Sequence, residues 1–135
     1  SLELLLNLSK RYYERQFNTR SAKHSDVVSQ FQSMLKAYYE SGMFRDQGIP
    51  SIEFFSEKAL LSANYLSDLL KKETGYSAKD QINNFIIEKA KTLLLSESDS
   101  VSGIAYTLGF NYPHYFSRMF KSKTGMTPQE YRQLN

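Results

Sequence analysis

Apolar side chains recur every three or four residues along most of the chain, and no segment shows the strict alternation of a half-buried strand. This spacing predicts a first amphipathic helix over residues 2–17 and a second that begins after Ser25 and stops at Gly42. Residues 42–50, which end in Gly-Ile-Pro, have the composition of a linker. We therefore expect an all-α fold with two helices in its N-terminal part.

From residue 51 onward, side chains that can cap a helix alternate with short apolar runs. The predicted N-caps are Ser51, Ser62, Ser77, Ser100, Asn111 and Thr127. The last is the most specific, because Thr-Pro-Gln-Glu combines a hydroxyl cap, a proline at the first helical position and a glutamate at the third. We expect helices over about 52–59, 63–74, 78–96, 101–108, 112–124 and 128–133.

This second part of the chain contains an internal repeat. Residues 64–82 align with residues 114–132 without a gap, with identical residues at Tyr65/Tyr115, Ser67/Ser117, Lys71/Lys121, Thr74/Thr124 and Gly75/Gly125. The second copy carries one extra residue just before its second helix. Each copy reads as helix, short turn, helix, so two helix-turn-helix units are predicted, whose second helices (about 62–74 and 112–124) are candidates for entry into a DNA major groove.

The helix that joins the two copies sets their separation. About 18 residues at 1.5 Å each span roughly 27 Å, which is close to the ~34 Å of one DNA turn. Both second helices could therefore reach successive grooves on one face of a duplex. A helix-turn-helix also occurs as a plain packing motif, and the duplication is what favours DNA binding over that alternative.

Composition and charge narrow the function classes. The 135 residues are 41% apolar with no Cys and two His, so disulfide scaffolds, thiolate catalysis and Cys-ligated zinc are excluded, and we expect neither metal nor cofactor. No apolar run reaches the ~18 residues of a membrane span, and the charged start is unlike a secretory signal, which predicts a cytoplasmic protein. Glycine-rich phosphate loops, nucleophile elbows and metal-spaced His pairs are absent from the sequence, so an enzyme is not expected.

The net charge of +3 is informative only when it is divided along the chain. Residues 112–135 contain four Lys or Arg and one Glu, whereas residues 51–111 contain six basic and eight acidic residues. The positive charge is therefore concentrated in the second copy, where a polyanion would be favoured.

The segment from Ser51 to Arg132 resembles the DNA-binding region of the AraC/XylS family of bacterial transcriptional regulators. The resemblance is carried by Ile104-Ala105, Leu108-Gly109-Phe110, Tyr115-Phe116-Ser117-Arg118, Phe120-Lys121, Thr124-Gly125-Met126-Thr127-Pro128 and Tyr131-Arg132. It implies a seven-helix module with two helix-turn-helix units joined by a long helix, which reads two successive major grooves of promoter DNA. RNA polymerase is then an expected partner.

The resemblance also implies a domain organisation. Such modules are usually preceded by an effector-sensing or dimerising domain, so residues 1–48 are expected to be a helical segment and linker that follow an upstream domain. Residues 49–96 form the first unit with the linking helix, and residues 97–135 the second unit. A homodimer would form through the upstream domain or the N-terminal helix.

Outward residues near the start of each second helix are the candidates for DNA contact. In the first unit they are Ser62, Ala63, Asn64, Ser67, Asp68, Lys71 and Lys72. In the second unit they are Tyr112, Pro113, His114, Ser117, Arg118 and Lys121. We expect Arg118 to contact guanine, Asn64 to pair with adenine, and the lysines to bind phosphates. Asp68 is unusual there, and a surface ion pair is an alternative for it.

Other residues have structural interpretations. Tyr65 and Tyr115 are assigned mainly to packing, or to a hydroxyl contact with phosphate. For His114 the alternative to base contact is an exposed residue near the cap. Leu60 stands where the first turn calls for a small or polar residue, so it would be strained if that position needs a positive φ. Gly103 weakens a short helix by about 1 kcal/mol relative to Ala. The competing hypothesis for the whole chain is a helical protein–protein interaction or dimerisation module without base readout.

Overall fold

The computed structural model describes residues 26–134, and all regular structure within that range is helical. The first described helix covers residues 26–41. It is followed by α2 (Phe44–Gln47), α3 (Ile52–Ala59), α4 (Ala63–Thr74), α5 (Ala78–Ser96), α6 (Val101–Thr107), α7 (Pro113–Thr124) and α8 (Pro128–Arg132). The predicted all-α fold is confirmed, while the helix expected over 2–17 lies outside the described residues.

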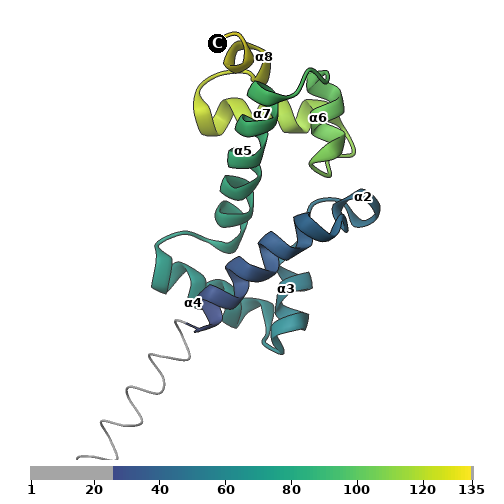
Figure 1. Ribbon diagram of the computed structural model, residues 1–135. Helices are drawn as coiled ribbons and strands as arrows, with labels where there is room; N and C mark the ends of the chain where they lie inside the picture. Colours follow the sequence, from purple (N-terminus) through teal and green to yellow (C-terminus); the bar gives the residue numbers. More distant parts are fainter. Residues whose placement is uncertain (1–25, 135) are drawn as a thin grey trace, which may run out of the picture.

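The long helix α5 connects two groups of helices (Figure 1). The pair α3 and α4 packs at its N-terminal end, and α6, α7 and α8 gather at its C-terminal end. The helix at 26–41 crosses the first group, and the α2 turn that follows it packs against α6 of the second group. Two helix-turn-helix units joined by one helix are therefore present. The contact between α2 and α6 connects them a second time.

Most predicted helix starts are confirmed by capping geometry. The Ser62 hydroxyl oxygen accepts the Tyr65 amide at 3.1 Å, and Ser51, Ser77 and Ser100 accept the third amide of their own helices in the same way. Thr127 and Glu130 form the complete capping box. These bonds satisfy backbone donors that the helix itself leaves unpaired, which is why hydroxyl residues mark the starts so reliably.

The repeated Thr-Gly pairs end α4 and α7 in the same manner. Gly75 and Gly125 both have φ of 82°, in the left-handed region that glycine adopts without strain. The Thr74 hydroxyl donates to the Leu70 carbonyl, and the Thr124 hydroxyl donates to its equivalent, Phe120. The identity of these residues in both copies is therefore explained by helix termination.

Two sequence-based predictions were wrong in detail. The N-cap of α7 is Tyr112 rather than Asn111, because Pro113 takes the first helical position and the cap is the residue that precedes it. Within the predicted linker at 42–50 lies the helical turn α2, which forms because Phe44 is buried against the ring of Tyr39.

One continuous core runs through both units. Its largest fully buried side chains include Phe31 from the first described helix, Phe55 from α3, and Phe116 and Phe120 from α7. Among the described residues, no buried side-chain nitrogen or oxygen lacks a hydrogen-bond partner. Within the same range, none of the helices combines the length and the apolar character that crossing a membrane requires.

Candidate nucleic-acid interface

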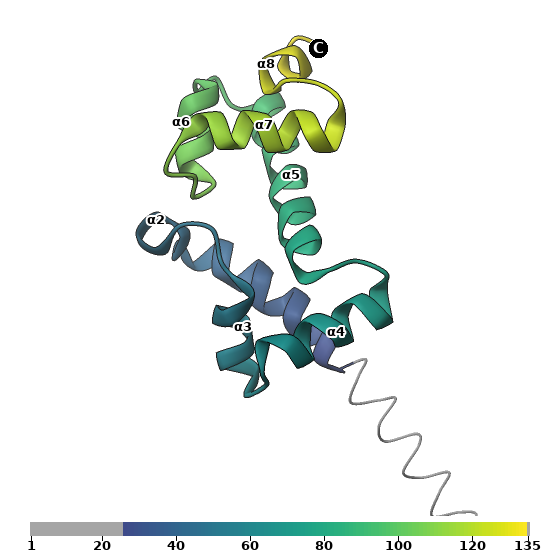
Figure 2. The ribbon, with the colours of Figure 1, turned by 180° about the vertical axis from the view of Figure 1, so that it is seen from behind.

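The second helix of each unit lies on the same side of the molecule. Figure 2 shows α4 in front of the helix at 26–41, and α7 in front of α5. The helix at 26–41 therefore covers the opposite side, which faces the viewer in Figure 1. One straight ligand could contact α4 and α7 together without meeting the helix at 26–41.

Helix α4 presents a polar stripe to solvent. Asn64, Asp68, Lys71 and Lys72 are exposed, while Leu66, Leu69 and Leu70 are buried on the other face. The exposed positions recur at intervals of three and four residues, which places them along one side of a helix. The stripe carries one negative and two positive side chains.

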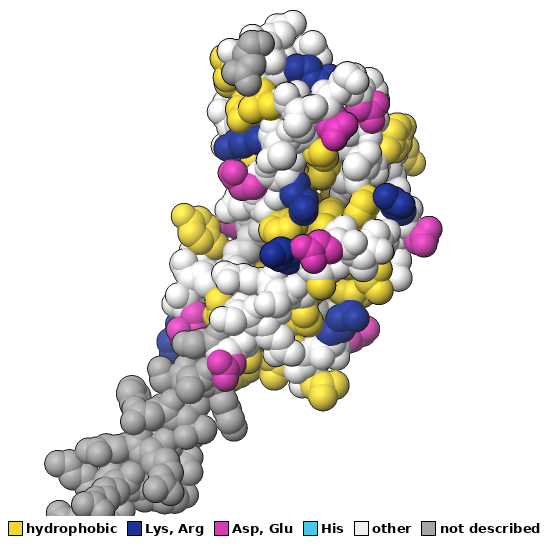
Figure 3. All heavy atoms as spheres, viewed as in Figure 1, with side chains coloured by type: hydrophobic (Ala, Val, Ile, Leu, Met, Phe, Trp, Pro, Cys, Tyr) yellow, Lys and Arg dark blue, Asp and Glu magenta, His cyan; other side chains and the backbone are white. Residues whose placement is uncertain are grey.

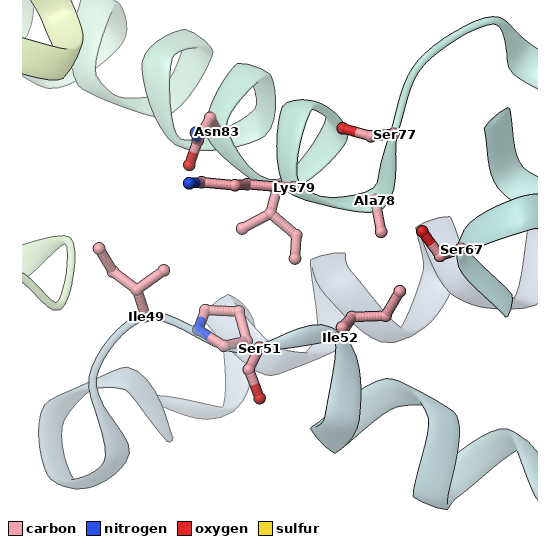
Figure 4. Close-up of a pocket in the computed structure, with 10 residues that line it drawn as sticks. Ile49, Ser51, Ile52, Ser67, Ser77, Ala78, Lys79 and Asn83 are labelled. Atoms are coloured by element: carbon pink, nitrogen blue, oxygen red, sulfur yellow. The ribbon is translucent and has the colours of Figure 1, made fainter. Parts of the chain in front are cut away.

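Not every predicted residue of the first unit is equally available. The Ser62 hydroxyl already accepts the Tyr65 amide, and Ala63 is partly buried. Ser67 is also partly buried, and it points toward a cavity of about 340 Å³ whose apolar wall includes Ile49 and Ile52 (Figure 4). The most accessible candidates of this unit are therefore Asn64 and the residues one and two turns after it.

Helix α7 presents the corresponding stripe of the second unit. His114, Arg118 and Lys121 are exposed at intervals of four and three residues, and Ser117 beside them is partly buried. The buried face of the helix is formed by its phenylalanines. Pro113 is half-buried at the start of the helix, as a first-turn proline should be. No acidic side chain lies in this stripe.

The start of α7 also carries a cluster of three exposed rings. The His114 and Tyr115 ring centroids are 4.3 Å apart, and Tyr112 lies 5.9 Å from His114 and 5.8 Å from Tyr115. Tyr112 and Tyr115 expose 59% and 53% of their surface. An exposed aromatic cluster offers apolar edges and hydroxyl groups at the same place, which suits contact with sugars, methyl groups and phosphates.

The repeated tyrosines are more exposed than their predicted packing role requires. Tyr65 is 48% exposed, close to the value for Tyr115, so packing accounts for only half of each side chain. Their partial exposure could have been inferred from the sequence, because each tyrosine directly follows a predicted DNA-contact residue, Asn64 or His114, at the edge of the apolar face. By contrast, Tyr38 and Tyr39 are buried, so tyrosines serve both the core and the surface in this chain.

The basic residues of the second unit divide into two pairs. The Lys123 ammonium lies 3.3 Å from a carboxylate oxygen of Asp80, and Arg132 donates to the backbone carbonyls of Leu94 and Glu97 at the end of α5. Arg118 and Lys121 make no ion pair or side-chain hydrogen bond within residues 26–134. The charge available to a ligand is thus concentrated on the exposed stripe of α7.

The opposite side of the molecule has a different electrostatic character. Figure 3 shows it with basic and acidic side chains interspersed, and with no extended patch of one sign. A surface of mixed sign presents no extended positive field to a polyanion. Across residues 26–134, no group of three or more His, Cys, Asp or Glu side chains is placed to hold a metal ion.

Residues 55–134, which make up more than half of the chain, match the family of helix-turn-helix domains. The solved structures that resemble the chain include an AraC-type DNA-binding domain protein from Chromobacterium violaceum, with a TM-score of 0.68, 21% identity, and coverage of 83% of this chain and 94% of that one. The chain belongs to the AraC-type helix-turn-helix family. The predicted resemblance is therefore confirmed.

Further relatives of this AraC-type chain agree with that assignment. A helix-turn-helix-type transcriptional regulator in the cgkA 5′ region of Pseudoalteromonas carrageenovora is 34% identical over 95 residues, which are 70% of this chain and 54% of that protein. The chain thus spans about half the length of that relative. The C-terminal domain of AraT, a response regulator from Geobacillus stearothermophilus, superimposes with a TM-score of 0.71 at 29% identity, covering 81% of this chain and 85% of that domain.

The AraC-type fold is also shared with the DNA-binding domain of AdpA, a global transcriptional factor solved in complex with a target DNA. That match has a TM-score of 0.66 and 19% identity, and covers 78% of this chain and 91% of the AdpA domain. At that identity the likeness shows the fold alone.

Proposed function

We propose that this AraC-type chain is the DNA-binding part of a bacterial transcriptional regulator, and that α4 and α7 enter successive major grooves of promoter DNA. The observation that carries the proposal is the placement of both helices on one side of the molecule (Figure 2), each with an exposed polar stripe. Helix α5, at 19 residues and about 28 Å, provides a separation comparable with one DNA turn. The AdpA domain, which has the same fold, was solved on its target DNA.

In this proposal the second unit supplies the main base contact. Arg118 is exposed and has no ion-pair partner among the described residues, so its guanidinium can bind the two acceptors of guanine. His114 lies one turn earlier, with Tyr112 and Pro113 at the start of the helix and Ser117 beside Arg118. Lys121 follows one turn later, where an ammonium group suits phosphate.

The first unit contributes differently. Asn64 is its candidate for a bidentate pair with adenine, and Lys71 and Lys72 are candidates for phosphate. Ser62, Ala63 and Ser67 lie near the same surface with fewer free polar atoms. Because Asp68 places a negative charge in the middle of the stripe, we infer that this unit is held mainly by phosphates.

The organisation around the module is part of the proposal. We infer that residues 49–96 and 97–135 act as the two reading units, and that residues 1–48 connect them to an upstream sensing or dimerising domain. RNA polymerase and a second copy of the protein would be the protein partners, and the cytoplasm is the compartment in which promoter DNA is reached. The family is one of DNA-binding regulators rather than enzymes, which supports a function without catalysis.

The competing hypothesis is an interaction module in which the helix-turn-helix units only pack. It is not favoured, because such a module gives no reason for two equivalent exposed stripes on one side of the molecule. It predicts that a dimer is lost when the helix predicted over residues 2–17 is removed, which analytical ultracentrifugation would detect.

Selection of bound duplexes from a random library tests the proposal directly. We expect two half-motifs whose centres lie about one helical turn apart, and an affinity that falls steeply with salt as phosphate-bound counterions are released. A duplex with both halves scrambled is the matched control. Equal binding of selected and scrambled duplexes by the folded chain would refute sequence-specific recognition, whereas a single half-motif would support base reading by one unit only.

A further inference from the structure

The side chain of Tyr39 joins three parts of the molecule. Its ring stacks on Phe44 of α2 at 5.3 Å and lies 5.5 Å from the ring of Phe85 on α5. Its hydroxyl donates to the carbonyl of Leu108, at the end of α6, at 3.2 Å. A residue that precedes the first helix-turn-helix unit therefore holds the turn of the second, 69 positions away in sequence.

The backbone on either side of this hydrogen bond is also in close contact. Gly48 and Ile49 approach Gly109 so closely that a Cβ atom built on Gly109 would lie 3.1 Å from the Gly48 carbonyl carbon. The neighbouring Tyr38 hydroxyl donates to the Gly48 carbonyl, which closes the segment on itself without reaching the second unit. The 38–49 segment is thus packed tightly against the turn from which α7 begins.

The hydrogen bond of Tyr39 is well protected. The side chain is 7% exposed, and burial, with a smaller contribution from Tyr38, raises the pKa of its hydroxyl above the ordinary value. The hydroxyl therefore remains a neutral donor over the physiological pH range. If the Tyr39 hydroxyl is removed, no water can easily replace it as donor, and the buried carbonyl is left without a hydrogen bond.

We propose that Tyr39 is a positioning residue for DNA binding, which through Leu108 fixes the placement of α7 relative to α4. The inference rests on the proposed function, since placement matters only if both helices must enter grooves of one duplex. Helix α5 is the covalent connection between the units, and the contacts of Tyr39 and Gly48 with Leu108 and Gly109 add a non-covalent attachment beside it. Two attachments restrict a rotation that one helix alone would allow.

The first experiment measures placement without DNA. The chain contains no Cys, so spin labels can be attached at Lys72→Cys and Ser122→Cys, equivalent exposed positions on α4 and α7. Pulsed electron paramagnetic resonance should give a narrow distribution of label distances, which becomes broader in Tyr39→Phe. Tyr38→Phe is the matched control, because it removes the same kind of bond one residue away without breaking a contact to the second unit.

The second experiment measures the consequence for binding, with unlabelled protein and the selected duplex. We expect Tyr39→Phe to lower affinity for the duplex with both half-motifs about five- to tenfold, because a rigid link makes the second contact intramolecular. Affinity for a duplex with one half scrambled should change by less than about twofold. Tyr38→Phe should leave both affinities within about twofold of the wild type.

A second pair of variants tests whether a broader distance distribution could result from general loss of stability. Gly48→Ala and Gly42→Ala both place a side chain at a positive φ, 75° and 81°. Gly48 also has ψ of −154°, a combination that is almost restricted to glycine, and a side chain there crowds Gly109 at 3.3 Å from its carbonyl oxygen. Circular dichroism and thermal unfolding establish that each variant is folded at the assay temperature. We expect Gly48→Ala to broaden the distance distribution and Gly42→Ala to leave it unchanged.

The outcomes separate this inference from the proposed function. Unchanged label distances and an unchanged ratio of the two affinities in Tyr39→Phe would overturn the positioning role. An equal effect of Tyr38→Phe would overturn it as well, because the cause would then be general loosening of the segment. If the wild type prefers no duplex sequence, the proposed function fails, and the label distances alone decide whether Tyr39 fixes the two units.

Discussion

In the first unit the turn between α3 and α4 is made by Leu60 with φ of 59°, whereas the second unit uses Gly109 with φ of 100° at the equivalent place. The Leu60 side chain is 91% exposed, so it meets no obstacle once the strained backbone is accepted. Gly109 lies against the backbone of Gly48 and Ile49. The same turn thus needs a left-handed residue in both copies, but only the second copy also requires the absence of a side chain.

The second helices of the two units, α4 and α7, also begin differently. Helix α4 starts at Ser62, whose hydroxyl satisfies a backbone amide, while α7 starts at Tyr112 without a side-chain cap and with Pro113 in the first turn. At the first start the residue before the helix serves as its cap. The second start leaves the tyrosine ring free to join the exposed cluster with His114 and Tyr115, so this cluster belongs to the unit whose stripe contains no acidic residue.

The largest expected effect comes from Gly109→Ala. A methyl group there combines positive φ with a 3.1 Å approach to backbone, and we expect a loss of about 2 to 3 kcal/mol of unfolding free energy. Urea denaturation measures it. Gly125→Ala is the control, since φ is 82° but nothing lies within 4 Å of the added atom. An equal loss in both variants would show that crowding by Gly48 has no energetic weight.

Arg118 and Asp68 occupy the same position in the two units but have opposite charges, so substituting each of them tests how differently the two stripes bind DNA. Arg118→Ala should weaken binding to the selected duplex by about 1 to 3 kcal/mol, or roughly 5- to 150-fold, and relax preference at one base pair. Asp68→Ala, at the same position of the first unit, should leave affinity unchanged or improve it, because a negative charge near phosphates is removed. Fluorescence anisotropy at fixed salt measures both. A larger loss for Asp68→Ala would reverse the assignment of the two units.

The helix starts provide a smaller contrast. Ser62→Ala removes the acceptor of the Tyr65 amide and should cost about 1 kcal/mol of stability. Tyr112→Ala should cost about 0.5 kcal/mol or less, because no capping bond is lost. Thermal unfolding of the two variants gives the comparison. If they are equally destabilised, the Ser62 hydroxyl makes no specific contribution.

Relief of strain in the first turn should be smaller still and opposite in sign. Leu60→Gly removes a left-handed leucine that costs about 1 to 2 kcal/mol, and this gain is reduced by the greater flexibility of glycine in the unfolded chain. We expect a net stabilisation of about 0.5 kcal/mol by urea denaturation. A destabilised variant would mean that the exposed Leu60 side chain makes a contact that stabilises the fold.

The smallest effect is expected at Asp80 and is dependent on pH. Asp80 reaches across to Lys123, whereas the equivalent Glu130 reaches back to the amide of Thr127. The Lys123 ammonium, and then the Ser77 hydroxyl, lower the pKa of Asp80. A lowered folded-state pKa contributes stability above the unfolded value, and that contribution is lost as the pH falls through the folded value.

Thermal scans of the wild type and Asp80→Asn should therefore differ slightly near neutral pH and converge as the pH falls below about 4. The difference should also shrink with added salt, because both groups are partly exposed. A difference between the two proteins that persists in acid would show that the substitution acts through packing rather than charge.

Much of the fold was predictable because its signals are local. Ser51, Ser62, Ser77 and Thr127 lie within four residues of the amides they cap, and the Thr-Gly endings act over a similar range. The cap of α7 is Tyr112 and not the predicted Asn111, since Pro113 takes the first helical position although Asn111 is the better capping residue. Local chemistry therefore gives helix ends to within about one residue.

The features that could not be predicted from the sequence depend on contacts between residues far apart in the chain. The α2 turn is not predictable from its own residues, because it forms through the burial of Phe44 against Tyr39. The residues that follow Phe44 are polar and have the composition of a linker. The exposed stripes on α4 and α7 followed from helical spacing, but the exposed halves of Tyr65 and Tyr115 did not, because they lie at the edge of the apolar face. No periodicity could have connected Tyr39 to Leu108.

The bonds from Arg132 to Leu94 and Glu97 have a consequence for the order of folding during synthesis. The helix caps of the first unit can form as soon as its own residues leave the ribosome, because each cap lies three residues from the amide that it accepts. The carbonyls of Leu94 and Glu97 receive their donor only when Arg132, which lies 38 and 35 positions later, has been synthesised. The last turn of α5 should fray in nascent chains that stop before Arg132, and become ordered only as α8 docks.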